Sequence, residues 1–162
     1  MHANASLIER FYQAFQQQDA EAMAACYHPE VVFNDPVFKD LRGERAGNRW
    51  RMLCGRATDL KVTFSDVSAD DATGRAHWEA TYTFGATGNV VHNVIDAAFT
   101  FEDGLIRTHT DTFDLWRWAG MALGMKGKLL GWAPPVQGAV RKQALAQLVR
   151  FEEKRAANAA SE

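Results

Sequence analysis

Two aspartates in apolar surroundings are the residues of this sequence best suited to acid–base chemistry. Asp35 lies in residues 31–38 and Asp96 in residues 94–99, both dominated by branched and aromatic side chains. A buried carboxylate is costly unless it is paired or protonated. Two carboxylates whose environments push their pKa values apart can divide the work of moving a proton. The sequence therefore predicts a pocket in which Asp35 and Asp96 act together.

A histidine and an aspartate two residues apart form a second polar feature. His109 and Asp111 share one face of a predicted strand with Phe113, because side chains alternate along a strand. We expect this face to line the interior. An imidazole oriented by a carboxylate can act as an acid or a base near neutral pH.

Each of these residues also has a purely structural interpretation. Asp35 could serve only as a turn residue before Pro36, since Asn-Asp-Pro is a common turn signal. Asp96 could form a salt bridge with Arg107 on the neighbouring strand, and His109 could be a buried structural histidine.

The predicted strands carry several residue types that bind metals, but no metal motif. None of them has the helical His spacing that makes a metal site recognisable. We therefore expect no metal, and we expect His77 to face the outer surface of the sheet. The residues concerned are His77, His92, Asp96, His109 and Asp111.

Hydrophobic periodicity predicts helices and strands in an α+β order. Helices are expected over residues 6–17, 20–27, 43–57, 115–125 and 136–155, with a loop over 126–135. Strands are expected over 31–38, 60–67, 75–84, 90–101 and 105–113. The order predicts helices on one face of a curved antiparallel sheet.

Composition narrows the function classes. Apolar residues make up 47% of the 162 residues, and the formal net charge is -2. This balance gives no case for nucleic acid or an anionic membrane as a partner. Cys26 and Cys54 are expected to be free thiols. Neither a signal-peptide pattern nor a membrane-spanning stretch is evident, so we expect a cytoplasmic protein.

Several motifs together resemble the NTF2-like superfamily, and within it the ketosteroid isomerases and SnoaL-like polyketide cyclases. The resemblance covers residues 6–113, so we expect one domain over 1–114 and a helical extension, a lid or dimer element, over 115–162. Its most specific pieces are residues 26–36, 43–45, 94–96 and 101–104.

The resemblance implies a cone-shaped, strongly curved sheet wrapped around helices, with a deep apolar cavity. It implies that Asp35 is the base and that Asp96 is a neutral acid, as ketosteroid isomerase keeps one carboxylic acid protonated. The tyrosine expected on the first helix is replaced by Phe11, with Tyr12 beside it. This departure and the His109–Asp111 pair shift the resemblance towards the SnoaL-like cyclases.

We therefore expect a cofactor-independent isomerase-like or cyclase-like enzyme acting on a hydrophobic carbonyl compound. Asp35 would be the base, with Asp96 and His109 as hydrogen-bond donors and Asp111 orienting the histidine. Epoxide hydrolase or dehydratase chemistry is a related possibility, and a non-catalytic binding protein is the alternative. Aromatic residues expected on the substrate pocket are Phe11, Tyr12, Tyr27, Trp50, Trp78, Tyr82, Phe113 and Trp116.

A homodimer is the expected assembly. Residues 95, 97 and 99 are apolar, and we expect them on the outer face of the sheet, where they would need a cover.

Overall fold

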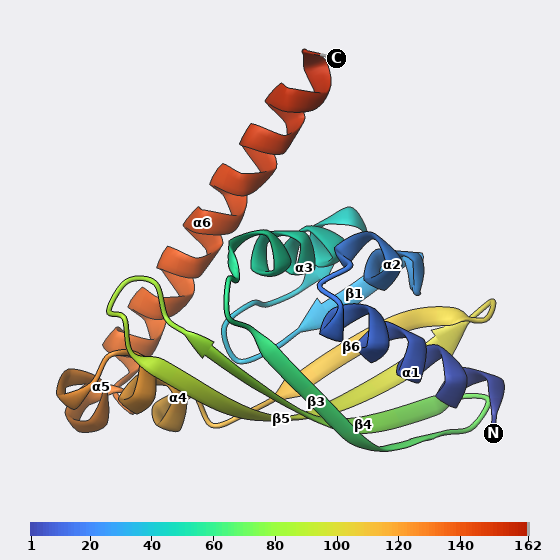
Figure 1. Ribbon diagram of the computed structural model, residues 1–162, viewed down its shortest axis with the longest axis horizontal. Coiled ribbons are helices and arrows are strands. Elements are labelled where there is room, and N and C mark those ends of the chain that lie inside the picture. The colour runs from blue at the N-terminus through green and yellow to red at the C-terminus, as the bar shows by residue number, and fades with distance from the viewer. Residues whose placement is uncertain (162) are drawn as a thin grey trace.

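Six strands form one curved sheet, shown in the computed structural model of Figure 1, which describes residues 1–161. Their order in the sheet is β2-β1-β6-β5-β4-β3. The strands are β1 (Tyr27–Asn34), β2 (Leu41–Arg42), β3 (Lys61–Ala69), β4 (Thr73–Thr83), β5 (Val90–Glu102) and β6 (Leu105–Thr112). The expected α+β class and curved sheet are confirmed.

Helices cover one face of the sheet and one of its ends. They are α1 (Ala3–Gln16), α2 (Ala20–Ala25), α3 (Glu44–Arg56), α4 (Leu115–Ala122), α5 (Met125–Leu130) and α6 (Pro134–Ala160). Figure 1 shows α1, α2 and α3 on the concave face, with α4 and α5 at one end of the sheet. From that end α6 runs past α3 and projects beyond it.

One strand pairing differs from the expected antiparallel arrangement. β1 pairs with β6 in parallel, placing Phe33 opposite His109, whereas the other neighbouring strands are antiparallel. Parallel neighbours need a long connection, and here it consists of every element from β2 to β5. This pairing brings the end of β1 beside the end of β6, where the site lies.

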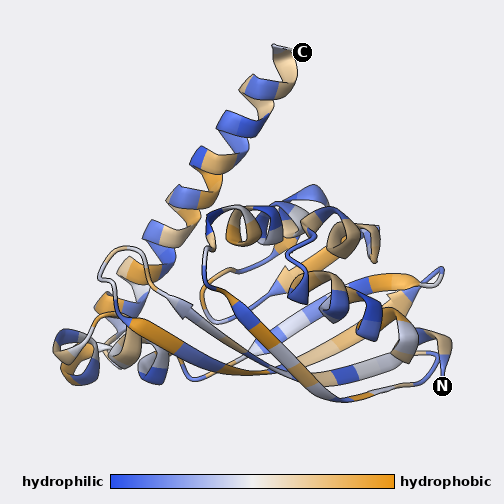
Figure 2. Cartoon of the chain, in the orientation of Figure 1, coloured by the Kyte–Doolittle hydropathy of each residue, from blue (hydrophilic) through white to orange (hydrophobic). Residues whose placement is uncertain are grey.

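The C-terminal extension is more helical than expected. Residues 126–135, expected as a loop, contain most of α5. A Cβ atom at Gly127 would lie 1.9 Å from the Ala119 carbonyl oxygen, so the glycine permits α4 and α5 to pack closely. In α6, Leu148 is the buried residue, and Figure 2 shows hydrophilic residues recurring along its projecting part.

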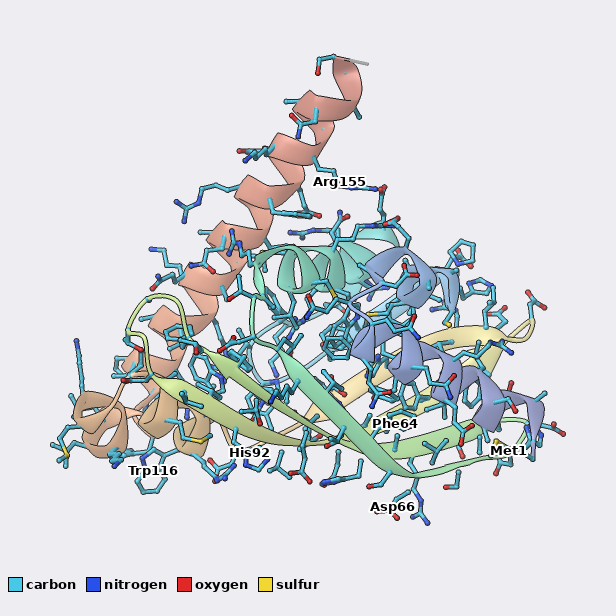
Figure 3. All side chains as sticks on the ribbon, in the orientation of Figure 1. Met1, Phe64, Asp66, His92, Trp116 and Arg155 are labelled. Carbon is cyan, nitrogen blue, oxygen red and sulfur yellow. The ribbon has the colours of Figure 1, made fainter. Side chains whose placement is uncertain are left out.

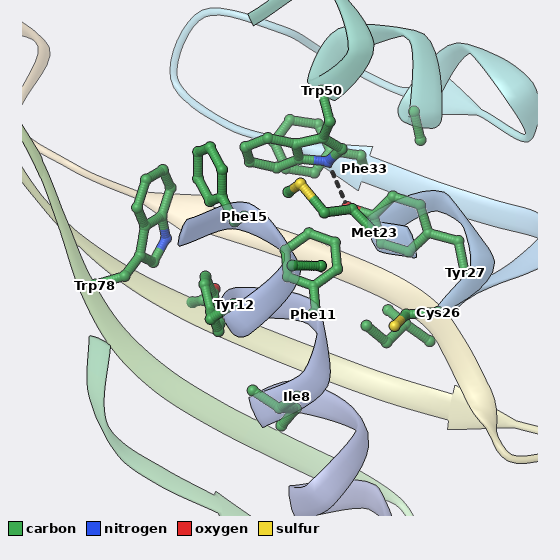
Figure 4. Packing of buried hydrophobic residues seen from close by; sticks show 14 of the residues in the cluster. Ile8, Phe11, Tyr12, Phe15, Met23, Cys26, Tyr27, Phe33, Trp50 and Trp78 are labelled. Carbon is green, nitrogen blue, oxygen red and sulfur yellow. Dashed lines mark hydrogen bonds between the residues drawn. The ribbon is translucent and has the colours of Figure 1, made fainter. Parts of the chain in front are cut away.

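The core between α1, α3 and the sheet is strongly aromatic. α1 buries Leu7, Ile8, Phe11 and Phe15 on one face, as its helical spacing predicts. The indole of Trp50 meets Phe15 edge-on, with ring centres 5.1 Å apart, as Figure 4 illustrates. Cys26 and Cys54 are free thiols.

Within residues 1–161, the helices lack the combination of length and apolar character that crossing a membrane requires.

Candidate active site

A small cavity lies where the ends of β1 and β6 meet α3, α4 and α6. Its volume is about 130 Å³. The expected pocket was deep and apolar, whereas about half of the lining residues here carry polar groups. The lining residues are Asp35, Val37, Phe38, Arg49, Trp78, Tyr82, Asn93, Ile95, Asp111, Phe113, Trp118 and Val140. A cavity of this size suits a molecule of roughly benzene's dimensions.

Asp35 combines the turn role and the cavity role that its sequence context suggested. β1 ends at Asn34, and Asp35 Oδ1 accepts hydrogen bonds from the backbone N–H groups of Val37 at 2.7 Å and Phe38 at 2.6 Å. The other oxygen, Oδ2, lies 3.8 Å from Arg49 Nη2. Burial raises the pKa of the Asp35 carboxyl above its ordinary value, although Arg49 and the two N–H groups act in the opposite direction.

Arg49 is a functional candidate that the sequence did not reveal. Its guanidinium lies over the Trp50 ring, 4.5 Å from the ring centre, and also faces Phe38 at 5.5 Å. Arg49 Nε is buried and has no hydrogen-bond partner among the residues that the structure describes. Helix α3 carries four arginines, and no sequence spacing distinguishes Arg49 from the others. The Arg49 side chain also lines the cavity, where it lies beside Asp35.

Asp111 is the second carboxylate on the cavity. It is 3% exposed, and its Oδ1 accepts a hydrogen bond from Trp78 Nε1 at 3.2 Å and lies at hydrogen-bond distance, 2.9 Å, from His109 Nε2. No hydrogen bond from residues 1–161 reaches its Oδ2. The Asp111 charge also contributes to the raised pKa of Asp35, so the two carboxyl groups influence each other.

His109 lies behind Asp111 and does not reach the cavity. The expected His109–Asp111 pair is confirmed, but His109 is 0% exposed and does not line the cavity wall. Its Nδ1 lies 2.8 Å from Tyr27 Oη, which also accepts a hydrogen bond from Trp50 Nε1 at 2.8 Å. The expectation that His109 donates directly to a substrate is therefore wrong, because Asp111 lies between His109 and the cavity.

The expectation that Asp96 faces the same cavity as Asp35 is also wrong. The Asp96 side chain is 81% exposed and hydrogen-bonds His77 Nδ1 at 2.9 Å on the outer face of the sheet. The expected alternative, a salt bridge to Arg107, does not form either, since Arg107 pairs with Glu102. In β5 the odd-numbered residues face inward, so Asn93 rather than Asp96 is its polar residue on the cavity.

Because the odd-numbered residues of β5 face inward, the argument given for a dimer no longer holds. Ile95, Ala97 and Phe99 belong to the core and leave no apolar outer stripe at these positions. The homodimer therefore stays a prediction without this support.

The outer face of the sheet instead carries a polar network. His77, as expected, lies on this face, and its Nε2 hydrogen-bonds Glu79, which also bonds His92 at 2.7 Å. Figure 3 shows His92 on the side of the sheet away from α1 to α3. The metal-binding residue types of the strands are thus divided between two faces and do not form one ligand set. A separate cluster of metal-binding residue types lies away from the cavity. It consists of His28, Glu102 and Asp103, and both acidic residues are exposed.

The aromatic residues expected on the pocket divide into three groups. Trp78, Tyr82 and Phe113 line the cavity. Trp116 is half-exposed and donates to the Lys128 carbonyl, so it lies outside the cavity. The remaining residues lie in the core rather than on the cavity wall: Phe11, Tyr12, Tyr27 and Trp50.

Trp118 takes the place on the cavity wall that Trp116 was expected to have. Its Nε1 donates to Tyr82 Oη at 2.8 Å, and its ring meets Phe84 edge-on. Both tryptophans lie on α4, and the sequence alone does not indicate which side of this helix faces the sheet. Together with Val140 of α6, Trp118 makes the C-terminal extension part of the cavity wall.

The family of the chain follows from its sequence match. A family model for the SnoaL-like domain matches residues 8–109, which is more than half of the chain and contains every strand except the last residues of β6. The chain belongs to the SnoaL-like domain family. No curated protein matches this SnoaL-like chain by sequence.

Solved structures share the fold of this SnoaL-like protein. An LEH-like epoxide hydrolase of M. tuberculosis is 22% identical, with a TM-score of 0.63, covering 82% of this chain and 96% of that one. A proposed SnoaL-like polyketide cyclase from Jannaschia sp. CCS1 is 15% identical, with a TM-score of 0.66, covering 75% and 92%. An NTF2-like protein of unknown function from Burkholderia pseudomallei K96243 is 17% identical, with a TM-score of 0.62, covering 70% and 92%. At these identities the likeness establishes the NTF2-like fold alone.

Proposed function

We propose that this SnoaL-like protein is a cofactor-independent acid–base enzyme acting on a small, largely apolar carbonyl compound. Asp35 and Asp111 carry the proposal. Each uses Oδ1 to accept two N–H hydrogen bonds from the protein, and each lines the same cavity with Oδ2 free of such bonds. Two carboxyl groups so arranged can hand a proton to and from one bound molecule.

The surroundings of Asp35 favour its neutral form. Burial and the neighbouring Asp111 charge favour the neutral form of Asp35, whose pKa is raised. Asp111, whose Oδ1 is occupied by Trp78 and His109, is then the carboxyl group with a free oxygen left to take a proton. We therefore assign Asp35 as the acid and Asp111 as the base. This reverses the role that the family resemblance implied for Asp35, and Asp111 takes part in place of Asp96.

The proposed reaction places the substrate oxygen near Asp35 and Arg49. Asp111 removes a proton from the carbon next to the carbonyl group, and the electron pair moves onto the carbonyl oxygen. Protonated Asp35 and the Arg49 N–H donate hydrogen bonds to the resulting enolate, which is the charge that such donors stabilise best. Return of the proton at another carbon gives isomerisation, whereas attack of the enolate on a second carbonyl gives ring closure.

Addition of water, as in epoxide opening, is the second candidate function. Asn93 supports it, because its amide lines the cavity and makes no side-chain hydrogen bond within residues 1–161. An amide can both donate to and accept from a water molecule. Asp111 would then take a proton from that water, while Asp35 protonates the epoxide oxygen.

Deuterium uptake tests the proposal directly. Small cyclic ketones and enones of benzene-like size are incubated with protein in D₂O, and exchange next to the carbonyl is followed by NMR. We expect catalysed exchange that Asp111→Asn lowers by about 10²–10⁴-fold. Asp96→Asn makes the same chemical change on the outer face and is expected to leave the rate unchanged.

Two other results would redirect the assignment. Diol formation from epoxides of the same size, without ketone exchange, would favour the second candidate. Ligand binding that persists in Asp111→Asn, with neither reaction detected in the wild type, would identify a non-catalytic binding protein.

A further inference from the structure

We infer that Trp50 and Tyr27 are positioning residues that fix the tautomer of His109, and that His109 thereby occupies Oδ1 of Asp111 and leaves Oδ2 as the oxygen that can take a proton. The consequence for catalysis rests on the proposed function. The tautomer itself follows from the hydrogen-bond chain alone.

The chain begins at a group that can only donate. Trp50 Nε1 is 2.8 Å from Tyr27 Oη, the bond drawn as a dashed line in Figure 4. An indole N–H has no acceptor function, so the tyrosine oxygen must accept this bond. The single hydrogen of the Tyr27 hydroxyl is then free for another acceptor, and His109 Nδ1 lies 2.8 Å away.

The direction of this bond determines where the imidazole keeps its own hydrogen. A neutral ring that accepts at Nδ1 carries its hydrogen at Nε2. Nε2 lies 2.9 Å from Asp111 Oδ1, which also accepts from Trp78 Nε1. Two N–H groups thus occupy Oδ1, and a proton taken from a substrate must go to Oδ2.

Other protonation states of His109 would leave a buried polar group without a partner. With the hydrogen on Nδ1, the Nε2 lone pair would face the Asp111 carboxylate. With both nitrogens protonated, the Tyr27 hydroxyl hydrogen would have no acceptor. An unpaired buried polar group is costly, and both Tyr27 Oη and His109 lie in the core.

Aromatic rings pack around the imidazole of His109. The packed rings come from α1, β1, α3 and β5, and the ionisable groups facing the imidazole are Tyr27 and Asp111. The neighbouring rings are Phe11, Tyr27, Phe33, Trp50 and Phe99. The hydrogen-bond chain therefore decides the tautomer.

The test reads the tautomer in the wild-type protein, so it does not depend on a variant that folds. Protein labelled with ¹⁵N-histidine is studied by long-range ¹H–¹⁵N correlation NMR at pH 7, with the His109 signals identified by their loss in His109→Gln. We expect a neutral ring protonated at Nε2. A neutral ring protonated at Nδ1, or a doubly protonated ring, would overturn the inference.

A pair of matched tyrosine variants tests the cause. Tyr27→Phe removes the hydroxyl that donates to Nδ1, and we expect the neutral Nε2–H pattern to give way to a doubly protonated ring, because Asp111 still needs the N–H at Nε2 and nothing then keeps a proton off Nδ1. Tyr82→Phe removes a hydroxyl that bonds Trp118 and not His109, and we expect the His109 pattern to persist. An unchanged pattern in Tyr27→Phe would show that Tyr27 does not fix the tautomer.

The kinetic consequence separates this inference from the proposed function. In Tyr27→Phe we expect kcat for deuterium exchange to fall by about 10–100-fold, with KM little changed, because a cationic His109 beside Asp111 opposes the transfer of a proton to that carboxylate. Deuterium exchange by a protein whose His109 ring is protonated at Nδ1 would support the proposed function and refute the inference. The expected tautomer in a protein that catalyses no exchange would support the inference and refute the proposed function.

Discussion

Asp111 on β6 lies opposite Ala97 on β5, one register position away from Asp96. Since side chains alternate between the faces of a sheet, this offset puts the two carboxyl groups on opposite faces. Asp111 is buried beside the cavity, and Asp96 is exposed beside His77. The carboxyl groups available for a shared reaction are therefore Asp35 and Asp111, and Asp96 provides a matched control.

Stability should decrease with rising pH because of Asp35. Its pKa is raised by burial, so the folded protein holds this proton more tightly than the unfolded chain. Unfolding midpoints measured from about pH 4 upwards should therefore show Asp35→Asn gaining stability relative to wild type as pH rises through the folded pKa. Glu153→Gln makes the same change at an exposed position and should run parallel to wild type. A constant difference between Asp35→Asn and wild type would contradict the assignment of Asp35 as the acid.

Arg49 should be needed for turnover in a way that lysine cannot replace. Its planar guanidinium stacks on Trp50 and lines the cavity as a fork of N–H donors, whereas a lysine ammonium lacks both the plane and the fork. Loss of one donor to a developing oxyanion costs about 10²–10³-fold in rate, so we expect this loss in kcat for Arg49→Lys. Arg45→Lys, on the same helix but paired with Glu152, should retain wild-type exchange. Equal activity of the two variants would remove Arg49 from the site.

Trp118 should limit the size of the ligand. It closes one wall of the cavity from α4 and bonds Tyr82. Trp118→Ala is expected to shift the preference in the exchange assay towards larger ketones, as measured by kcat/KM across a size series. Trp116→Ala removes an equal side chain from the surface of the same helix and should leave the preference unchanged. An identical size profile in Trp118→Ala and wild type would show that α4 does not bound the substrate.

Gly127 should be required for the packing of α5 on α4. An added Cβ would meet the Ala119 carbonyl oxygen at 1.9 Å, and a backbone contact cannot yield as a side chain does. We expect Gly127→Ala to lower the free energy of unfolding by about 1–3 kcal/mol, as overpacking does. At Gly138, within α6, an added Cβ meets nothing within 4 Å. Gly138→Ala should therefore raise stability by up to about 1 kcal/mol. Urea unfolding of both variants measures the contrast, and a loss at Gly138 equal to that at Gly127 would refute the packing argument.

Short-range sequence patterns correctly predicted the features that depend on neighbouring residues in the chain. The amphipathic period of α1 correctly predicted its buried face, and strand alternation correctly placed His109 and Asp111 together. β5 was different, because it is apolar at both odd and even positions around Asp96. Which residues of β5 face inward depends on its register with β4 and β6. The prediction placed the even-numbered residues inward, and so put Asp96 on the cavity where the structure has Asn93.

The sequence by itself determined the order of helices and strands, the α+β class and the likeness to the SnoaL-like proteins, because these depend on short-range periodicity and motifs. It also placed Asp35 at a turn and His109 beside Asp111. Only the tertiary structure decided that Asp111, rather than Asp96, shares the cavity with Asp35, and that Arg49 and Trp118 join them. These neighbours come from β1, β6, α3 and α4, and long-range pairing, such as the parallel contact of β1 with β6, brings them together. Such contacts depend on packing across the whole chain, which no local spacing encodes.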